Sequence, residues 1–104
     1  MSKKSNISKL TTFLALALSH KIGGIVNLNE IYATKYNKEY ENYFNQAKEI
    51  AFEENFNLYD KSQIKIILKR KLNNELTRKD FIDNRKYTLI DEEVNKVLLS
   101  LNLS

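Results

Sequence analysis

The chain of 104 residues contains no cysteine and no proline, and it has only two glycines and one histidine. Without cysteine there is no disulfide framework, no thiolate nucleophile and no cysteine-bound zinc or iron–sulfur cluster. Without proline, and with so little glycine, the chain lacks the turn residues on which all-β folds depend. Helix is therefore the expected secondary structure.

The single histidine, His20, limits the catalytic chemistry that the chain can offer. A site built on two imidazoles is excluded, and a general base would need a partner that the sequence does not identify. Near the end of the first predicted helix the helix dipole favours a cation, so a capping or surface role is expected. The adjacent pairs Glu53-Glu54 and Glu92-Glu93 point in different directions on a helix, unlike a facing acid–base pair. We expect no catalytic residue, metal site or cofactor, and hence no enzyme.

The composition is that of a folded domain, with 42% hydrophobic and 29% charged residues. This balance favours a globular fold over disorder, and a chain of this length supplies apolar surface for one core only. We expect a single domain over residues 1–104, with residues 1–5 as a disordered tail. Lysines precede an apolar run at residues 13–18, but this run is too short for a secretion signal or a membrane span. A cytoplasmic location is therefore expected.

Apolar residues recur at spacings of three and four, which predicts an all-α protein: a compact bundle of four to five helices. The first helix is expected to begin near Ser5 or Ser8. Gly23 and Gly24 are expected to end it, because glycine after a helix readily takes the left-handed conformation that closes the last turn. The glycine pair is the strongest helix boundary that the sequence offers.

A long second helix, rich in aromatic residues, is the most prominent element predicted. Asn27 or Asn29 would cap it, and it would pack against the first, third and last helices. A helix-turn-helix with a break near Asn37 is the alternative, but no strong breaker stands there and the would-be recognition helix is acidic. A continuous helix is therefore expected, followed by a turn from which Phe56 and Leu58 fold back onto the core.

Two further helices and a connection complete the predicted fold. Asp60 and Gln63 match a capping box at the start of a third helix. Residues 77–86 are predicted as a short helical continuation and a turn, and residues 87–90 as an extended stretch. Asp91 is expected to begin the last helix, which has acidic residues in its first turn, where the helix dipole favours anions.

Positive charge is unevenly distributed along the chain, whose formal net charge is +4. Residues 61–86 carry nine basic and three acidic side chains, whereas residues 22–60 carry three basic and seven acidic ones. Cations along a helix and the following turn neutralise phosphates and release counterions, the main source of non-specific affinity for nucleic acid. The leading hypothesis is a small non-enzymatic protein that binds nucleic acid through this basic helix. The candidate residues are Lys65, Lys69, Arg70, Lys71, Arg78 and Lys79.

A solvated helix surface is the plainer interpretation of the same basic run. At about 100° per residue, Lys65 and Lys69 flank one side of the apolar stripe, whereas Arg70 and Lys71 point elsewhere. The cations are thus spread around the helix, and a net charge of +4 is modest for a nucleic-acid binder. Both interpretations remain open at the level of sequence.

The tyrosines of the second predicted helix carry the competing hypothesis, a protein-interaction module or small complex subunit. Tyrosines at helical spacing can bury their rings in a core and leave their hydroxyls at its wet margin, which is the plainest interpretation. They can also dock on a protein partner or a second copy of the chain, or stack on bases. The residues concerned are Tyr32, Tyr36, Tyr40 and Tyr43.

Overall fold

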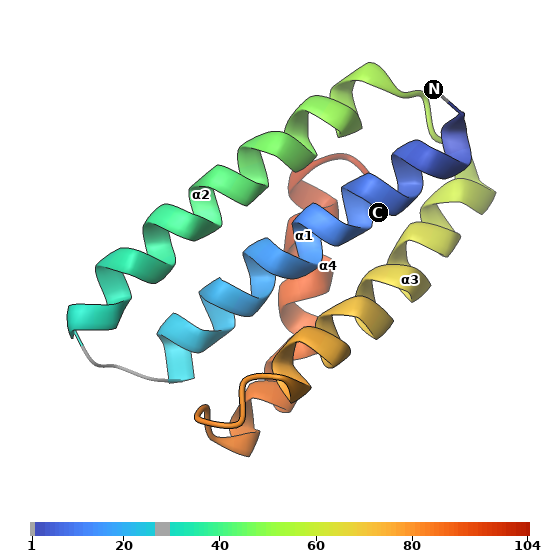
Figure 1. Cartoon of the computed structure of the whole chain (residues 1–104). Coiled ribbons are helices and arrows are strands. Elements are labelled where there is room, and N and C mark those ends of the chain that lie inside the picture. Colours follow the sequence, from blue (N-terminus) through green and yellow to red (C-terminus); the bar gives the residue numbers. More distant parts are fainter. Residues whose placement is uncertain (1, 27–29) are drawn as a thin grey trace.

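The computed structural model describes residues 2–26 and 30–104, with the backbone alone for residues 30–34. The described residues form four α-helices and one 3-10 helix, and they contain no strand (Figure 1). The predicted all-α class is confirmed, with four α-helices in the bundle. The elements are α1 (Lys3–Val26), α2 (Glu30–Glu53), α3 (Leu58–Thr77), the 3-10 helix η1 (Asn84–Leu89) and α4 (Ile90–Ser100).

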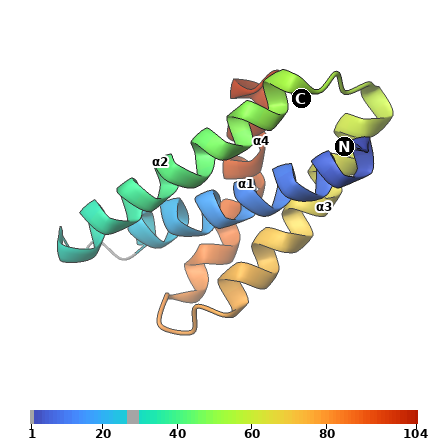
Figure 2. The ribbon, with the colours of Figure 1, turned by 45° about the horizontal axis from the view of Figure 1, so that its top comes forward.

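α1 is the central helix of the bundle. It lies between α2 and α3, while α4 crosses behind these helices at a steep angle (Figures 1 and 2). α2 packs chiefly against α1, so the prediction that the second helix packs against the first, third and last helices alike is wrong. The reason is charge: residues 10–19 of α1 include no charged side chain, whereas charged residues recur along the whole of α2. Only α1 can be covered on several sides without burying ions.

The core is a layer of leucine, isoleucine and valine side chains in which α1 takes the largest part. α3 contributes one residue per turn, at a spacing of four, which keeps them on one face. α2 contributes small side chains, Ala47 and Ala51, which let its backbone approach α1. The largest fully buried aliphatic residues of α1 and α3 are Leu10, Leu14, Leu18, Ile22, Ile64, Leu68, Leu72 and Leu76.

The predicted continuity of α2 is confirmed, because the helix passes through Asn37 without a break. The proposed caps Asn27 and Asn29 lie outside the described residues. In the turn after α2, Phe56 folds back onto the core as expected, with 7% of its surface exposed. Leu58 does not: it remains 83% exposed at the start of α3.

Gly23 and Gly24 do not end α1, contrary to the prediction, since the helix continues to Val26. Neither glycine has a positive φ. What Gly23 provides is space, because a Cβ there would lie 3.1 Å from Cδ1 of Ile82 and 3.5 Å from Cζ of Tyr36. The side chains of Ile82 and Tyr36 are both buried at this point. Gly23 therefore allows Ile82 and Tyr36 to pack closely against α1, and it does not end the helix.

The beginnings of α1 and α3 also differ from the prediction. α1 begins at Lys3, where the Ser2 hydroxyl oxygen accepts a hydrogen bond from the Ser5 amide at 3.2 Å. α3 is capped by Asn57, three residues before the predicted Asp60. The Asn57 side chain accepts from the Asp60 amide at 2.8 Å, and the Asp60 carboxylate accepts from the Asn57 amide at 3.0 Å. Asp60 is thus the last residue of the capping box, at the third position of the helix, instead of its first.

The connection between α3 and α4 was predicted wrongly in two places. α3 ends at Thr77, without the expected helical continuation, and the stretch expected to be extended belongs to the 3-10 helix η1. Asp83 caps η1 by accepting a hydrogen bond from the Arg85 amide at 2.8 Å. The ammonium group of Lys86, which is buried, donates to the Lys79 carbonyl at 2.7 Å and ties η1 to the preceding turn. Nothing in the sequence pattern indicates this hydrogen bond between the side chain of Lys86 and the backbone of Lys79.

The two glycines are expected to respond differently to alanine. Gly24→Ala should raise the free energy of unfolding by about 0.5–1 kcal/mol, because alanine is the better helix former and a Cβ there meets Tyr36 only at 3.6 Å, an ordinary contact. Gly23→Ala should give a smaller gain or a loss, because Ile82 must move. Urea unfolding of both variants and the wild type measures this difference. Equal stabilisation by the two substitutions would contradict the close packing at Gly23.

Candidate nucleic-acid interface

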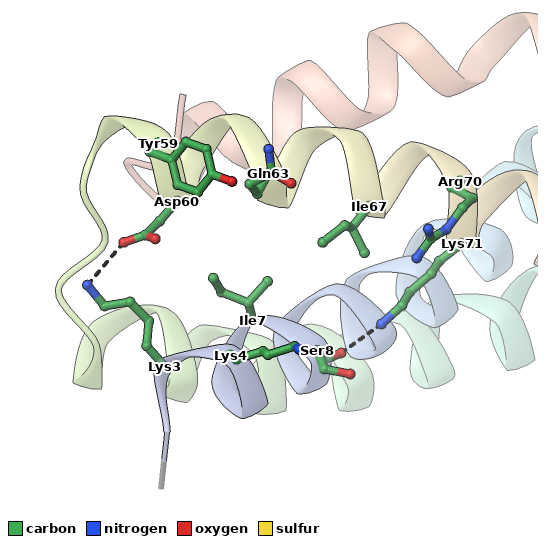
Figure 3. Close-up of a pocket in the computed structure, with 10 residues that line it drawn as sticks. All are labelled: Lys3, Lys4, Ile7, Ser8, Tyr59, Asp60, Gln63, Ile67, Arg70 and Lys71. Atoms are coloured by element: carbon green, nitrogen blue, oxygen red, sulfur yellow. Dashed lines mark hydrogen bonds and ion pairs between the residues drawn. The ribbon is translucent and has the colours of Figure 1, made fainter.

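The N-terminal part of α1 and about the first four turns of α3 form a groove with a volume of about 520 Å³ (Figure 3). We call this cavity the α1–α3 groove. Four cationic side chains line it, two from each helix, together with a single carboxylate, Asp60. The four cations are Lys3, Lys4, Arg70 and Lys71. Residues more than sixty positions apart in the sequence thus contribute to one positively charged surface.

The groove has an apolar centre between charged ends. Figure 3 shows Ile7 of α1 and Ile67 of α3 pointing toward each other in the middle of the groove. Tyr59 and Asp60 lie at one end, and Arg70 and Lys71 lie at the other. The groove therefore combines positive charge with an apolar floor, a combination that suits a ligand having an anionic part and a flat or apolar part.

The single carboxylate of the groove is neutralised within the protein. Asp60 forms an ion pair with Lys3, whose Nζ lies 3.0 Å from Oδ2 of the carboxylate. The hydrogen bond from the Asn57 amide and the adjacent Lys3 ammonium hold the pKa of Asp60 below its usual value. Asp60 therefore stays ionised and paired, and Lys4, Arg70 and Lys71 set the charge of the groove.

Lys71 clamps α3 to α1. Its ammonium group donates three hydrogen bonds to α1: to the Ser8 carbonyl at 2.9 Å, the Thr11 hydroxyl at 2.8 Å and the Thr12 hydroxyl at 2.9 Å. Burial, and to a smaller extent the neighbouring Arg70 guanidinium, lower the pKa of Lys71. All three ammonium protons are used within the protein, so Lys71 adds positive potential to the groove while its main contacts are structural.

The six cations predicted from the sequence do not form one surface. Only Arg70 and Lys71 line the α1–α3 groove, while Lys65 lines a separate groove between α3 and α4. Lys69 pairs with Asp91 of α4 at 3.0 Å, and Arg78 pairs with Glu75 at 3.3 Å. The last member, Lys79, is half-buried, and its carbonyl accepts the hydrogen bond from Lys86 described above.

Three residues of the groove were missed by sequence reasoning: Lys3, Lys4 and Tyr59. A signal for the two lysines existed, because residues 1–21 contain four lysines and no acidic residue. In the sequence these lysines were interpreted only as the basic start of a secretion signal, and residues 1–5 were expected to be a disordered tail. Tyr59 has no such signal, since nothing in the sequence indicates that the one aromatic side chain of α3 lies beside α1.

The described tyrosines of α2 lie at its contact with α1. Tyr36 is buried beside the glycines of α1, and the ring of Tyr43 stacks on His20 with centroids 5.7 Å apart. Tyr40 stacks on Phe44 with centroids 5.6 Å apart. The fourth residue of the stripe, Tyr32, has its side chain outside the described part of the chain.

His20 lies between α1 and α2, six residues before the end of α1, because the helix continues past the glycines. Its Nδ1 is 3.0 Å from a carboxylate oxygen of Glu39 but makes no well-aligned hydrogen bond. Burial lowers the pKa of His20 below its usual 6.5 and outweighs Glu39, which raises it. His20 is therefore a neutral, half-buried ring at neutral pH.

Several kinds of site are missing from the described residues. No cluster of three or more histidine, aspartate or glutamate side chains is arranged to hold a metal ion there. Likewise, none of the helices formed by the described residues combines the length and the hydropathy needed to cross a membrane.

Comparison of the chain with family models, with curated proteins and with solved structures finds no match. The fold and the groove define the chain as a helical bundle with a positively charged groove. A function for it must be inferred from its own residues.

The free energy of unfolding is expected to decrease as the pH is lowered, because His20 becomes protonated. Because burial depresses its folded-state pKa, the unfolded state binds the proton more readily, so stability is lost as pH falls below about 6.5, the unfolded value. His20→Gln cannot titrate. Urea unfolding at pH 7.5 and 5.5 should show a smaller loss for His20→Gln than for the wild type. An equal loss would contradict the buried neutral state.

Lys71 and Arg70 are expected to contribute differently to stability. Lys71→Met removes the donor for three oxygen atoms of α1 and should lower the free energy of unfolding by about 1 kcal/mol or more. Arg70→Met removes the same charge from an exposed position and should change it by less than about 0.5 kcal/mol. Urea unfolding of both variants tests the clamp. Similar values for the two would argue against it.

Proposed function

We propose that this protein is a non-enzymatic binding protein for nucleic acid and that the α1–α3 groove is its binding surface. One observation carries the proposal: cations from two separate segments meet in a groove whose only carboxylate is already paired with Lys3. The proposal keeps the partner inferred from the basic run of the sequence. It differs from the sequence hypothesis in the residues that bind, because Lys4 and Arg70 are now the main contacts in place of the six cations of residues 61–86.

Lys4 and Arg70 have the properties of phosphate ligands. Both side chains are exposed, and no acidic side chain among the described residues pairs with either of them. A guanidinium group can bind a phosphate through two parallel hydrogen bonds, and a lysine can bind one as a point charge. Ser8 adds an exposed hydroxyl between them.

The charge distribution of the whole molecule supports the same surface. α2 carries five acidic and three basic residues, and α1 separates it from α3 (Figure 1). A polyanion is therefore repelled from the α2 side and attracted to the α3 side. With about two or three phosphates neutralised, affinity should fall roughly tenfold between 50 and 200 mM salt, a modest slope that matches a net charge of +4.

The competing function, docking of a protein partner on the tyrosine stripe, has less support. Tyr36 is buried, and Tyr40 and Tyr43 are half-buried with ring contacts inside the molecule. Residues already packed against their own chain offer little new apolar area to a partner.

Fluorescence anisotropy of labelled oligonucleotides across a salt series tests the proposed function. Lys4→Gln with Arg70→Gln should weaken binding roughly tenfold, because two phosphate contacts are lost. The matched control is Lys38→Gln with Lys48→Gln, which removes the same charge from exposed positions on α2. This control should change affinity less than about twofold, by its effect on overall charge alone.

Two results would overturn the proposed function. One is an absence of binding by the wild type even at low salt. The other is equal weakening by the groove pair and the α2 pair, which would mean that the oligonucleotide responds to net charge and not to the α1–α3 groove.

A further inference from the structure

Tyr59 is an exposed aromatic side chain placed at the end of the α1–α3 groove. It is the second residue of α3, within the capping box that Asn57 and Asp60 form, and 70% of its surface is exposed. Figure 3 shows its ring beside the groove, next to Asp60 and Gln63. A single exposed aromatic residue has no special meaning by itself. The position of this one at the rim of a cationic groove is what gives it a role.

The groove has the parts that a single-stranded nucleic acid needs. An exposed tyrosine ring can stack on a base of any kind, because every base has a π-face. Beyond it, Ile7 and Ile67 form an apolar floor, which favours a flat aromatic base over a hydrated ion. The volume of about 520 Å³ is sufficient for a small ligand of this kind but not for a duplex.

The spacing of the groups along α3 fits a short piece of backbone. Tyr59 and Arg70 are separated by eleven residues, so their Cα atoms lie about 16 Å apart along the helix axis, at about 1.5 Å per residue. A base at Tyr59 and a phosphate at Arg70 therefore belong to the same strand but to different nucleotides. Lys4 faces this line from α1.

A duplex cannot use the groove in this way. Its bases are stacked and paired inside, so it presents only phosphates to a helical surface unless a base is flipped out at a cost. A duplex would contact Lys4 and Arg70 but leave Tyr59 and the apolar floor unused. Gln63 carries both a donor and an acceptor and can satisfy either kind of base edge, so little preference for one base is expected.

We propose that the α1–α3 groove accepts one unpaired base of a single strand, stacked on Tyr59, with neighbouring phosphates on Lys4 and Arg70. This inference rests on the proposed function, because it specifies which form of nucleic acid the groove binds. The protein is then selective for single strands, with little selectivity for sequence.

The first experiment uses a unique fluorophore. The chain contains no tryptophan, so Tyr59→Trp introduces one emitter at the rim of the groove. Titration with an oligo(dT) of about twelve nucleotides, a length within the range bound by single-strand proteins, should quench this emission through stacking. The control is Tyr87→Trp, at an exposed residue of η1 whose hydroxyl bonds to Thr77 and which does not line the groove. Its emission should not be quenched.

The second experiment separates stacking from phosphate binding. By anisotropy, the wild type should bind the single strand at least about fivefold more tightly than a duplex of equal length, since stacking of one base adds at least that factor. Tyr59→Leu should remove this preference, whereas Tyr59→Phe should keep it. Because Tyr59 is exposed, both variants should retain the helical circular dichroism of the wild type.

The outcomes distinguish the two proposals. If single strand and duplex bind equally and Tyr59→Leu changes nothing, the stacking inference is overturned while phosphate binding at the groove stands. If Tyr59→Trp and Tyr87→Trp are quenched alike, the base does not stack at the groove, and the inference is again overturned. If neither nucleic acid binds, both the inference and the proposed function fail.

Discussion

The burial of α1 between α2 and α3 is the constraint on which the rest of the structure depends. The uncharged stretch at residues 10–19 of α1 cannot remain in water, and a single neighbouring helix covers only one of its sides. α2 and α3 therefore pack on opposite flanks of α1, and α4 closes the remaining face of the core (Figures 1 and 2). The α1–α3 groove lies between the N-terminal parts of these two helices, where charged and polar side chains join Ile7 and Ile67 in its lining.

Polar contacts between helices then fix how the apolar faces are aligned. The carboxylate of Glu93, buried on α4, pairs with Lys21 of α1, and Lys71 of α3 reaches across to the hydroxyl groups of Thr11 and Thr12. A buried polar group without a partner costs far more than a made hydrogen bond returns. A slip of one helix by a turn would break these contacts, whereas the leucine layers alone would tolerate it. The polar contacts thus give the bundle a single arrangement.

Sequence reasoning found the helices because their signal is local: the four-residue ladder of α3 and the unbroken α2 are both visible in the pattern of apolar residues. It misjudged Gly23, because only the fold brings Ile82 and Tyr36 against it. The candidate site was found only in part for the same reason. A run of cations does not reveal that Lys69 is taken by Asp91, nor that the N-terminal lysines lie beside α3.

α1 and α3 run in the same direction, with their N-terminal ends side by side (Figure 1). α2, which follows α1 and precedes α3 in the sequence, runs in the opposite direction on the other side of α1. This order has a consequence during synthesis. An α1–α2 hairpin can form from local contacts as soon as α2 is complete, but the side of α1 that faces α3 stays uncovered until residues 58–77 have also been made. For that interval the nascent chain exposes leucine side chains of α1 to its surroundings, and they are covered only when α3 packs against them.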